Sequence, residues 1–315
     1  IMGIIILKAI GQVLLVLLIA PLTFGVIRKL KAWSQHRMGA PALQAYYDIA
    51  KLMKKDMVLP ETASWIFRAA PYVYLGSALT AAVLIPVIPG LFSFEFAGDA
   101  LWVVYLLALG RFFLTMSGLD TGSTFGGMGS SREMMIASLI EPSILVSLFT
   151  LGMISPFQSL NLHAIYRGVS DLGWGIINPT MALVFIALLI ITVAETARIP
   201  VDDPATHLEL TMVHEAMTLE YSGRCFAMTQ LASAVKQLLF LTLIVNLFMP
   251  FGFTGAGFLV TLANTGLYCG KIIMMALIVG LIEINSVKLR LFSVPNLAAL
   301  AFILSLLGFF LAFVL

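Results

Sequence analysis

Residues 227–250 read AMTQLASAVKQLLFLTLIVNLFMP, an apolar run in which Lys236 is the only charged side chain. A helix that crosses a bilayer needs about 20 predominantly apolar residues, so this stretch predicts one transmembrane helix. The whole chain shares its character, because 60% of the 315 residues are hydrophobic and only 11% are charged. The mean hydropathy of +1.03 lies outside the range of soluble domains, so the sequence predicts a membrane protein.

Apolar runs of similar length recur along the chain. The eight candidate spans are residues 4–27, 69–89, 100–117, 134–154, 180–194, 227–250, 256–282 and 296–315. The stretches between them are too short to hold a separate soluble domain, and the longest is the segment 28–68. We therefore predict an all-α membrane protein, a single integral membrane domain over residues 1–315 built as a polytopic bundle of about eight transmembrane helices.

Basic residues gather on one side of the predicted bundle. The segment 28–68 carries eight Lys and Arg, whereas the connections at 89–100 and 251–256 carry none. Loops rich in Lys and Arg face the cytoplasm, so we predict both termini on the outside of a cytoplasmic (inner) membrane. The first span is expected to be retained, because its basic residues follow the apolar run, whereas a cleaved signal peptide carries them in front. The predicted inside loops are residues 28–68, 118–133, 195–226 and 283–295.

The first inside loop contains an amphipathic stretch at residues 43–54. Its aromatic and aliphatic residues, Tyr46 and Tyr47 among them, are interleaved with charged ones such as Asp48 and Lys51. A helix with this pattern lies in the membrane interface or presents its basic face to a partner protein. We therefore predict an interfacial amphipathic helix here, ended by Pro60.

The second inside loop, GLDTGSTFGGMGSSRE at residues 118–133, holds five glycines. It lacks the Gly-Lys-Ser/Thr ending of a phosphate-binding loop, so it does not indicate a nucleotide site. Its pattern predicts a flexible turn, ended by a capping box from Ser130 to Glu133 that opens the next helix.

The third inside loop concentrates acidic residues. The stretch 190–224, IITVAETARIPVDDPATHLELTMVHEAMTLEYSGR, holds more than a third of the sixteen Asp and Glu in the chain, namely Glu195, Asp202, Asp203, Glu209, Glu215 and Glu220. Carboxylates in or beside a bilayer are costly and by default mark ion or proton pathways. Pro200 and Pro204 are expected to break the preceding helix after Ile199, and a second helix is predicted over residues 205–220.

Five ionisable residues fall inside or at the ends of the later spans, namely Glu141, Glu195, Lys236, Lys271 and Glu283. Burial favours the uncharged form of carboxyl and amino groups. Such groups can therefore change protonation near neutral pH, as a proton relay requires. A purely structural alternative is that they pair across helices, Glu141 or Glu195 with Lys236 or Lys271.

Histidines and carboxylates in the acidic loop raise the question of a metal site. His207 and His214 are seven residues apart in the sequence, nearly two helical turns or about 10 Å along a helix. They are too far apart to share one ion without a further ligand, even with Glu209 and Glu215 nearby. We therefore predict no metal site. We also predict no catalytic residue and no bound cofactor in this chain. The net charge of +2 gives no indication of nucleic-acid binding.

Two inside loops resemble those of one membrane-protein family of respiratory complex I, the family that joins the membrane arm to the peripheral electron-transfer arm. AETARIPVD at 194–202 and EYSG at 220–223 resemble its acidic loop, and QHRMGAP at 35–41 with the following Gln44, Asp48, Lys51 and Leu52 resembles its first inside loop. Arg132 and Glu141, nine residues apart, match its pattern between the third and fourth helices. In its middle the acidic loop differs from the family, with Ala205 and His207 in place of glutamates and three residues inserted between Glu209 and Glu220.

The likeness covers nearly the whole chain in order and is nearer to the corresponding membrane protein of membrane-bound nickel–iron hydrogenases and formate hydrogenlyases. The residues that carry it are GLDTGS at 118–123, SRE at 131–133, Glu141-Pro142, Lys236-Gln237, and Lys271 followed by Glu283. The resemblance implies eight transmembrane helices, a place beneath a soluble hydrogenase or quinone-reducing module, and neighbouring antiporter-like subunits. Nickel–iron and iron–sulfur centres are then expected in partner subunits.

The resemblance also implies roles for particular residues. A proton path is expected to comprise Glu141, Glu195, Asp202, Asp203, Glu209, Glu215, Glu220, Lys236, Lys271 and Glu283. A surface that docks the soluble arm, or a quinone-like cavity, is expected at Arg37, Asp48, Lys51, Arg132, Arg198 and Tyr221.

The leading hypothesis is a membrane-anchor and proton-path coupling subunit of an energy-converting, membrane-bound hydrogenase-type complex. One alternative is the quinone-site subunit of a respiratory NADH:quinone oxidoreductase, whose cavity would admit a quinone headgroup. A second is a stand-alone ion transporter, which is expected to carry internal repeats that the sequence lacks.

Overall fold

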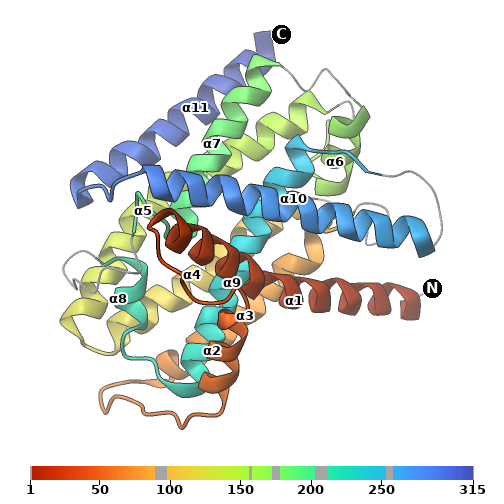
Figure 1. Ribbon diagram of the computed structural model, residues 1–315. Coiled ribbons are helices and arrows are strands. Elements are labelled where there is room, and N and C mark those ends of the chain that lie inside the picture. Colours follow the sequence, from red (N-terminus) through yellow and green to blue (C-terminus); the bar gives the residue numbers. More distant parts are fainter. Residues whose placement is uncertain are drawn as a thin grey trace.

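The computed structural model describes residues 2–88, 98–155, 158–171, 178–202, 212–252 and 258–314, and these residues form helices without any strand. Figure 1 shows their arrangement. In chain order the helices are α1 (Met2–Ser34), α2 (Gln44–Met53), α3 (Trp65–Leu84), α4 (Asp99–Asp120), α5 (Thr124–Ile154), α6 (Leu162–Asp171), α7 (Pro179–Glu195), α8 (His214–Thr218), α9 (Gly223–Phe248), α10 (Phe258–Asn285), η3 (Leu291–Ser293) and α11 (Val294–Val314).

The predicted all-α, multi-pass fold is confirmed. Seven stretches in the described part of the chain are long and apolar enough to cross a membrane, and they match seven of the eight predicted spans. The eighth predicted span, 180–194, corresponds to α7, an apolar helix of 17 residues. At 1.5 Å per residue α7 rises about 25 Å, slightly less than the hydrocarbon core of about 30 Å.

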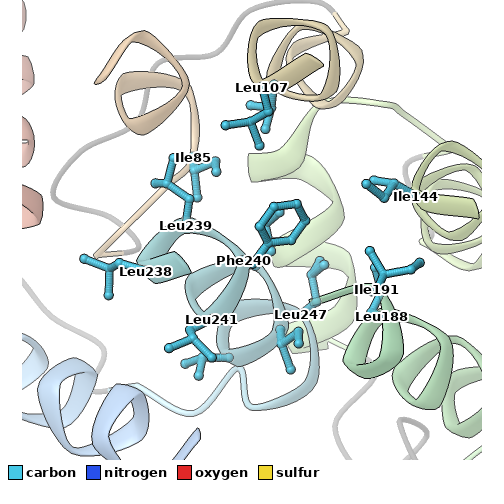
Figure 2. Close-up of a cluster of buried hydrophobic side chains, with 14 of the residues drawn as sticks. Ile85, Leu107, Ile144, Leu188, Ile191, Leu238, Leu239, Phe240, Leu241 and Leu247 are labelled. Atoms are coloured by element: carbon cyan, nitrogen blue, oxygen red, sulfur yellow. The ribbon is translucent and has the colours of Figure 1, made fainter. Parts of the chain in front are cut away.

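Helix α9 forms the core of the bundle (Figure 1). It packs against α1, α2, α3, α6, α7 and α10, and every residue from 234 to 247 is buried. Figure 2 shows its side chains pointing outward on several sides, with Leu239 near Ile85 of the α3 end and Phe240 between Leu107 and the α7 residues. Lipid tails are as apolar as leucine, so these contacts stabilise the bundle through close packing rather than exclusion from water.

The second inside loop differs from its prediction. Helix α5 begins at Thr124, with the Ser123 hydroxyl accepting from the backbone N–H of Gly126 at 3.5 Å, seven residues before Ser131, the first helical residue that the predicted capping box implies. The predicted capping box is therefore wrong. Ser130 donates instead to the backbone carbonyl of Thr115 at 2.8 Å. The glycines allow α4 and α5 to pack closely, because a Cβ at position 126 would overlap the Gly118 carbonyl oxygen of α4.

Gly129 lies where α5 meets α8. A Cβ added there would lie 2.8 Å from Cβ of Ala216 and 2.9 Å from the Val213 carbonyl, whereas a Cβ at Gly127 would meet nothing within 4 Å. We expect Gly129→Val to displace α8 and to destabilise the protein by about 1–3 kcal/mol through overpacking. Maleimide labelling of a cysteine placed at the buried Met217 measures the displacement. Gly127→Val is the matched control, and equal labelling in the two variants would contradict the packing role.

The first inside loop forms the predicted amphipathic helix. Helix α2 covers Gln44–Met53 and has no buried residue, and it lies across α1 and α9. It ends at Met53, seven residues before Pro60. Residue Ala42, just before α2, lies close against α1. This contact requires glycine at position 25, because a Cβ at Gly25 would overlap the Ala42 carbonyl oxygen.

The end of α7 also differs from its prediction. The helix stops at Glu195 rather than at Ile199, because Ala197 adopts a left-handed conformation with φ of 50°. The N–H of Arg198 then donates to Val193 O at 3.1 Å and that of Ala197 to Ala194 O at 3.2 Å, the pattern of a Schellman motif. This turn, rather than Pro200, ends the helix, and it directs Arg198 back toward the bundle.

The predicted helix over 205–220 lies partly outside the described residues. Its described part contains α8, and the Asp202 carboxylate accepts from the N–H groups of Val213 and His214 at 3.1 and 3.0 Å. Both α2 and α8 lie in the lower part of Figure 1, and α6 lies in the upper part. This separation agrees with loops 28–68 and 195–226 sharing one side of the bundle.

Candidate functional site

A buried arginine in α4 gathers carboxylates from two other helices. The Arg111 side chain is only 5% exposed, and its guanidinium forms ion pairs with Glu195 of α7, with Glu141 of α5 (Nη1–Oε1 3.2 Å) and with Glu133 of α5 (Nε–Oε1 3.7 Å). Lys236 of the central helix adds a second cation, 2.6 Å from the other oxygen of Glu195. We call these five residues the Arg111 cluster.

The Arg111 cluster contains three carboxyl groups and two cations. If all are ionised it carries one negative charge in excess, which is costly in a medium of low dielectric constant. One proton shared among the carboxyls would neutralise it. The excess negative charge therefore favours a bound proton or a further cation beside the cluster.

A second group of ionisable side chains is centred on Glu283 of α10. Its carboxylate forms ion pairs with Lys31 of α1 (3.1 Å) and with Arg198 (3.5 Å). Arg198 also donates to the side-chain oxygen of Gln237 at 2.8 Å and lies over the Phe24 ring. Burial lowers the pKa of Arg198, and the Glu283 carboxylate partly offsets this effect. We call Lys31, Arg198, Gln237 and Glu283 the Glu283 cluster.

Two helix segments connect these clusters. Lys236 and Gln237 are neighbours on α9, and each belongs to a different cluster. Glu195 and Arg198 stand at the two ends of the turn that closes α7. The clusters are therefore held side by side, and a charge change in one alters the electrostatic potential at the other.

The third inside loop and the α10–α11 connection meet at Asp202. Its buried carboxylate forms an ion pair with Lys288 at 3.3 Å while it holds the start of α8. Burial lowers the pKa of His214 below its ordinary value, and the charges of Glu133 and Asp202 oppose this shift. His214 is therefore less readily protonated than a solvent-exposed histidine.

A cavity of about 390 Å³ opens between α1, α2 and α9. Its lining includes Arg28, Asp48, Lys51 and Glu215. A smaller cavity of about 50 Å³ shares Phe24, Arg28, Glu215 and Gln230 with it and is also lined by Arg198, Asp202 and His214. The larger cavity reaches α2, and the smaller one reaches Arg198 of the Glu283 cluster.

The structure brings together some of the residues predicted for a proton path and separates others. Glu141, Glu195 and Lys236 lie in the Arg111 cluster, Glu283 lies in the second cluster, Asp202 pairs with Lys288, and Glu215 lines the cavities. Two others lie apart. Lys271 donates to the backbone carbonyls of Met249 and Phe251, and Glu220 is exposed. Asp203 and Glu209 lie outside the described residues.

One of the predicted ion pairs between helices is present. Glu195 pairs with Lys236, whereas Lys271 pairs with neither glutamate. A buried ion pair is compatible with a purely structural role, so the geometry alone leaves both interpretations of Glu195 open. Within the described ranges no group of three or more His, Cys, Asp and Glu is arranged to hold a metal ion.

The residues predicted for docking or for a quinone-like cavity do not form one surface. Asp48 and Lys51 line the larger cavity, Arg198 lines the smaller one and Arg37 is exposed. The other two make structural contacts. Arg132 donates to the Met212 carbonyl at 2.9 Å, and Tyr221 donates to the Phe67 carbonyl at 2.9 Å while its ring stacks on that of Phe67.

Sequence reasoning missed the arginine at the centre of the site. Arg111 is the only charged residue in the predicted span 100–117, and an ionisable residue inside a membrane span is a functional candidate by default. That signal was therefore available. Lys31 is one of the eight basic residues of segment 28–68, and no local pattern distinguishes it from the others. Glu133 was assigned to a helix cap, and no local sequence signal connects it with Arg111.

The chain is similar in sequence to membrane subunits of several oxidoreductases. The pattern of the NADH dehydrogenase family matches residues 7–313. Formate hydrogenlyase subunit 4 of Escherichia coli K12 is 34% identical over 303 residues, which cover 95% of each chain. Hydrogenase-4 component C of the same strain is 35% identical over 251 residues, or 79% of this chain and 77% of that protein. NADH-quinone oxidoreductase subunit 8 of Rhodothermus marinus is 31% identical over 233 residues, or 70% and 66%.

A solved structure has the same fold. One chain of the membrane-bound sulfane sulfur reductase, an archaeal respiratory membrane complex, superimposes with a TM-score of 0.83 over 98% of this chain and 99% of that chain. The two sequences are 20% identical, so this likeness concerns the fold.

Proposed function

Because the chain belongs to the NADH dehydrogenase family, we propose that it is the membrane-anchor and proton-path coupling subunit of a complex I-like, energy-converting complex of the hydrogenase type. The similarity to formate hydrogenlyase subunit 4 over 95% of both chains supports the class of complex. The observation that carries the coupling role is the succession of buried ionisable groups from the cavities, through the Glu283 cluster, to the Arg111 cluster.

In this proposal electron transfer in a soluble module changes the charge at the cytoplasmic face of the cavities. Glu215 and Asp202 respond first, and Arg198 and Glu283 pass the change to Gln237 and Lys236. The proton shared in the Arg111 cluster then moves. Side-chain carboxyls and water in the smaller cavity carry the proton, and the arginines and lysines set the energy of each position.

The spacing within the clusters is short enough for strong coupling. Two unit charges 4 Å apart interact by about 4 kcal/mol at an effective dielectric constant of 20. That energy corresponds to roughly a thousandfold change in a protonation equilibrium. Even the longest ion pair in the Arg111 cluster, between Arg111 and Glu133, is only 3.7 Å long. Loss or gain of one charge is therefore expected to redistribute protons throughout the cluster.

The same proposal places the chain in its assembly. Its inside loops, 28–68 and 195–226 foremost, face the cytoplasm across the cytoplasmic membrane, and a soluble hydrogenase module docks on them through Arg37 and the outer face of α2. That module holds the nickel–iron and iron–sulfur centres. Antiporter-like membrane subunits contact the exposed apolar faces of the remaining helices.

Glutamine variants of Glu195 and Glu141 test the proton path. Each substitution keeps the side-chain shape but removes the proton-carrying carboxyl, so hydrogen evolution in the assembled complex is expected to continue while proton movement is lost. A pH-sensitive dye in proteoliposomes measures that movement. Glu220→Gln is the matched control, because Glu220 is exposed and outside both clusters. Wild-type proton movement in both cluster variants would refute the proton path.

One observation favours a second candidate, the quinone-site subunit of an NADH:quinone oxidoreductase. The cavity of about 390 Å³ falls in the usual size range of small-molecule sites, about 300–1,000 Å³, and NADH-quinone oxidoreductase subunit 8 is among the similar proteins. Organic extraction of the purified complex distinguishes the two. A stoichiometric quinone favours the second candidate, and hydrogen evolution without quinone favours the first.

A further inference from the structure

The larger cavity combines an apolar interior with a basic mouth. Pro21 and Phe24 of α1, Leu52 of α2 and Ala234 of α9 line the interior. These side chains offer no hydrogen-bonding groups, so they favour an apolar chain as their neighbour. The interior lies beside the core of the bundle, because Pro21 and Ala234 are buried.

Three cations line this cavity, namely Arg28 of α1, Lys51 of α2 and Lys55 two residues after α2, and because all three are exposed they mark its mouth. Among the described residues none of the three forms an ion pair with a carboxylate. Two carboxylates also line the cavity. Asp48 accepts from the Gln44 amide at 2.9 Å, and Glu215 lines both this cavity and the smaller one. The lining therefore has one positive charge in excess, and its cations are free to bind an anion.

The depth of the cavity in the membrane follows from α1. This helix has 33 residues and rises about 50 Å, more than the hydrocarbon core of about 30 Å. Arg28 is the first charge after the apolar run that ends at residue 27, so it marks the level of the lipid headgroups. The amphipathic α2 lies at the same level. The apolar interior is then at the depth of lipid tails, and the basic mouth is at the depth of phosphates.

We propose that the cavity between α1, α2 and α9 binds an anionic phospholipid. Its phosphate contacts Arg28, Lys51 and Lys55, and one acyl chain enters between α1 and α9 alongside Phe24 and Ala234. This site goes beyond the proposed coupling function, because it requires no proton transfer. The bound lipid fixes α2 against α1 and separates the smaller cavity from the bilayer.

The charge of the mouth favours this occupant over a neutral amphiphile. Each Lys or Arg near an anionic lipid strengthens binding about fivefold, whereas a quinone headgroup carries no charge for the cations to bind. The interior alone would accept either molecule. Discrimination between them is therefore expected to depend on the two lysines.

The test uses the whole purified complex, delipidated in detergent and incubated with phosphatidylglycerol or phosphatidylcholine, with bound lipid counted by mass spectrometry. Wild-type complex is expected to retain phosphatidylglycerol at least tenfold better than phosphatidylcholine, and Lys51→Gln/Lys55→Gln is expected to remove this preference. Lys29→Gln/Lys54→Gln is the matched control, because it removes two exposed charges from the same loop but none from the cavity lining.

A second variant tests the interior separately. Ala234→Leu fills the space for the acyl chain while leaving all three cations in place, and it is expected to reduce phosphatidylglycerol retention as well. Three results would overturn the proposal: equal retention of the two lipids by wild type, equal loss in the control pair, or a quinone retained in place of phosphatidylglycerol. Activity of the complex does not enter the readout, so this test is independent of the proton-path test.

Discussion

Arg111→Met is expected to destabilise the protein by about 3–5 kcal/mol, the usual cost of removing one partner from a buried ion pair. Methionine fills similar volume in α4, so the loss reflects charge rather than a cavity. Glu133, Glu141 and Glu195 would be left with Lys236 as their one remaining cation in the Arg111 cluster. Thermal unfolding of the detergent-solubilised complex measures the effect. The loss should be smaller at acidic pH, where protonated carboxyls no longer need a cation.

Lys271→Met is the matched control for this prediction. Lys271 is also a cation within a long apolar helix, but its ammonium binds backbone carbonyls at the end of α9 instead of carboxylates. Its removal leaves no unpaired carboxylate, so a smaller decrease in the unfolding midpoint is expected. Equal decreases in the two variants, or none in Arg111→Met, would contradict the central role of Arg111.

The membrane helices could be predicted from the sequence because their signal is local. A run such as 227–250 has to satisfy its backbone hydrogen bonds internally within lipid, and apolar length alone locates it. Helix boundaries were less predictable. The glycines at 118–129 suggested a flexible turn, but close packing between α4 and α5 uses them instead. The left-handed residue in the turn that ends α7 is Ala197 rather than a glycine, so no local sequence signal predicts this turn.

The charged residues of the site were predictable individually, but their partners were not. Glu195, Lys236 and Glu283 each stand out as ionisable groups at a span. Their partners depend on the rotation of each helix about its axis, which packing between helices decides. Arg111 contacts Glu195 across 84 positions of sequence, and Lys31 contacts Glu283 across 252. No local periodicity encodes such contacts.

Glu283→Gln is expected to produce the second large effect, a destabilisation of about 3–5 kcal/mol. The variant leaves Arg198 and Lys31 without their shared carboxylate. The Arg198 side chain is only 4% exposed, so it recovers less hydration than the Lys31 side chain, which is 23% exposed. Lys31→Gln should therefore cost clearly less than Glu283→Gln in the same thermal unfolding measurement. A larger cost for Glu283→Gln than for Lys31→Gln would identify Arg198 as the cation whose charge Glu283 mainly compensates.

A double variant separates the charge effect from simple loss of packing. In Arg198→Gln/Glu283→Gln both buried charges are absent, so the combined cost should be smaller than the sum of the single costs, as for residues in direct contact. Strict additivity would contradict the ion pair. The coupling proposal adds a functional expectation for Glu283→Gln. The cavities and the Arg111 cluster lose their connecting carboxylate, so proton movement should fall even in the fraction of complex that remains folded.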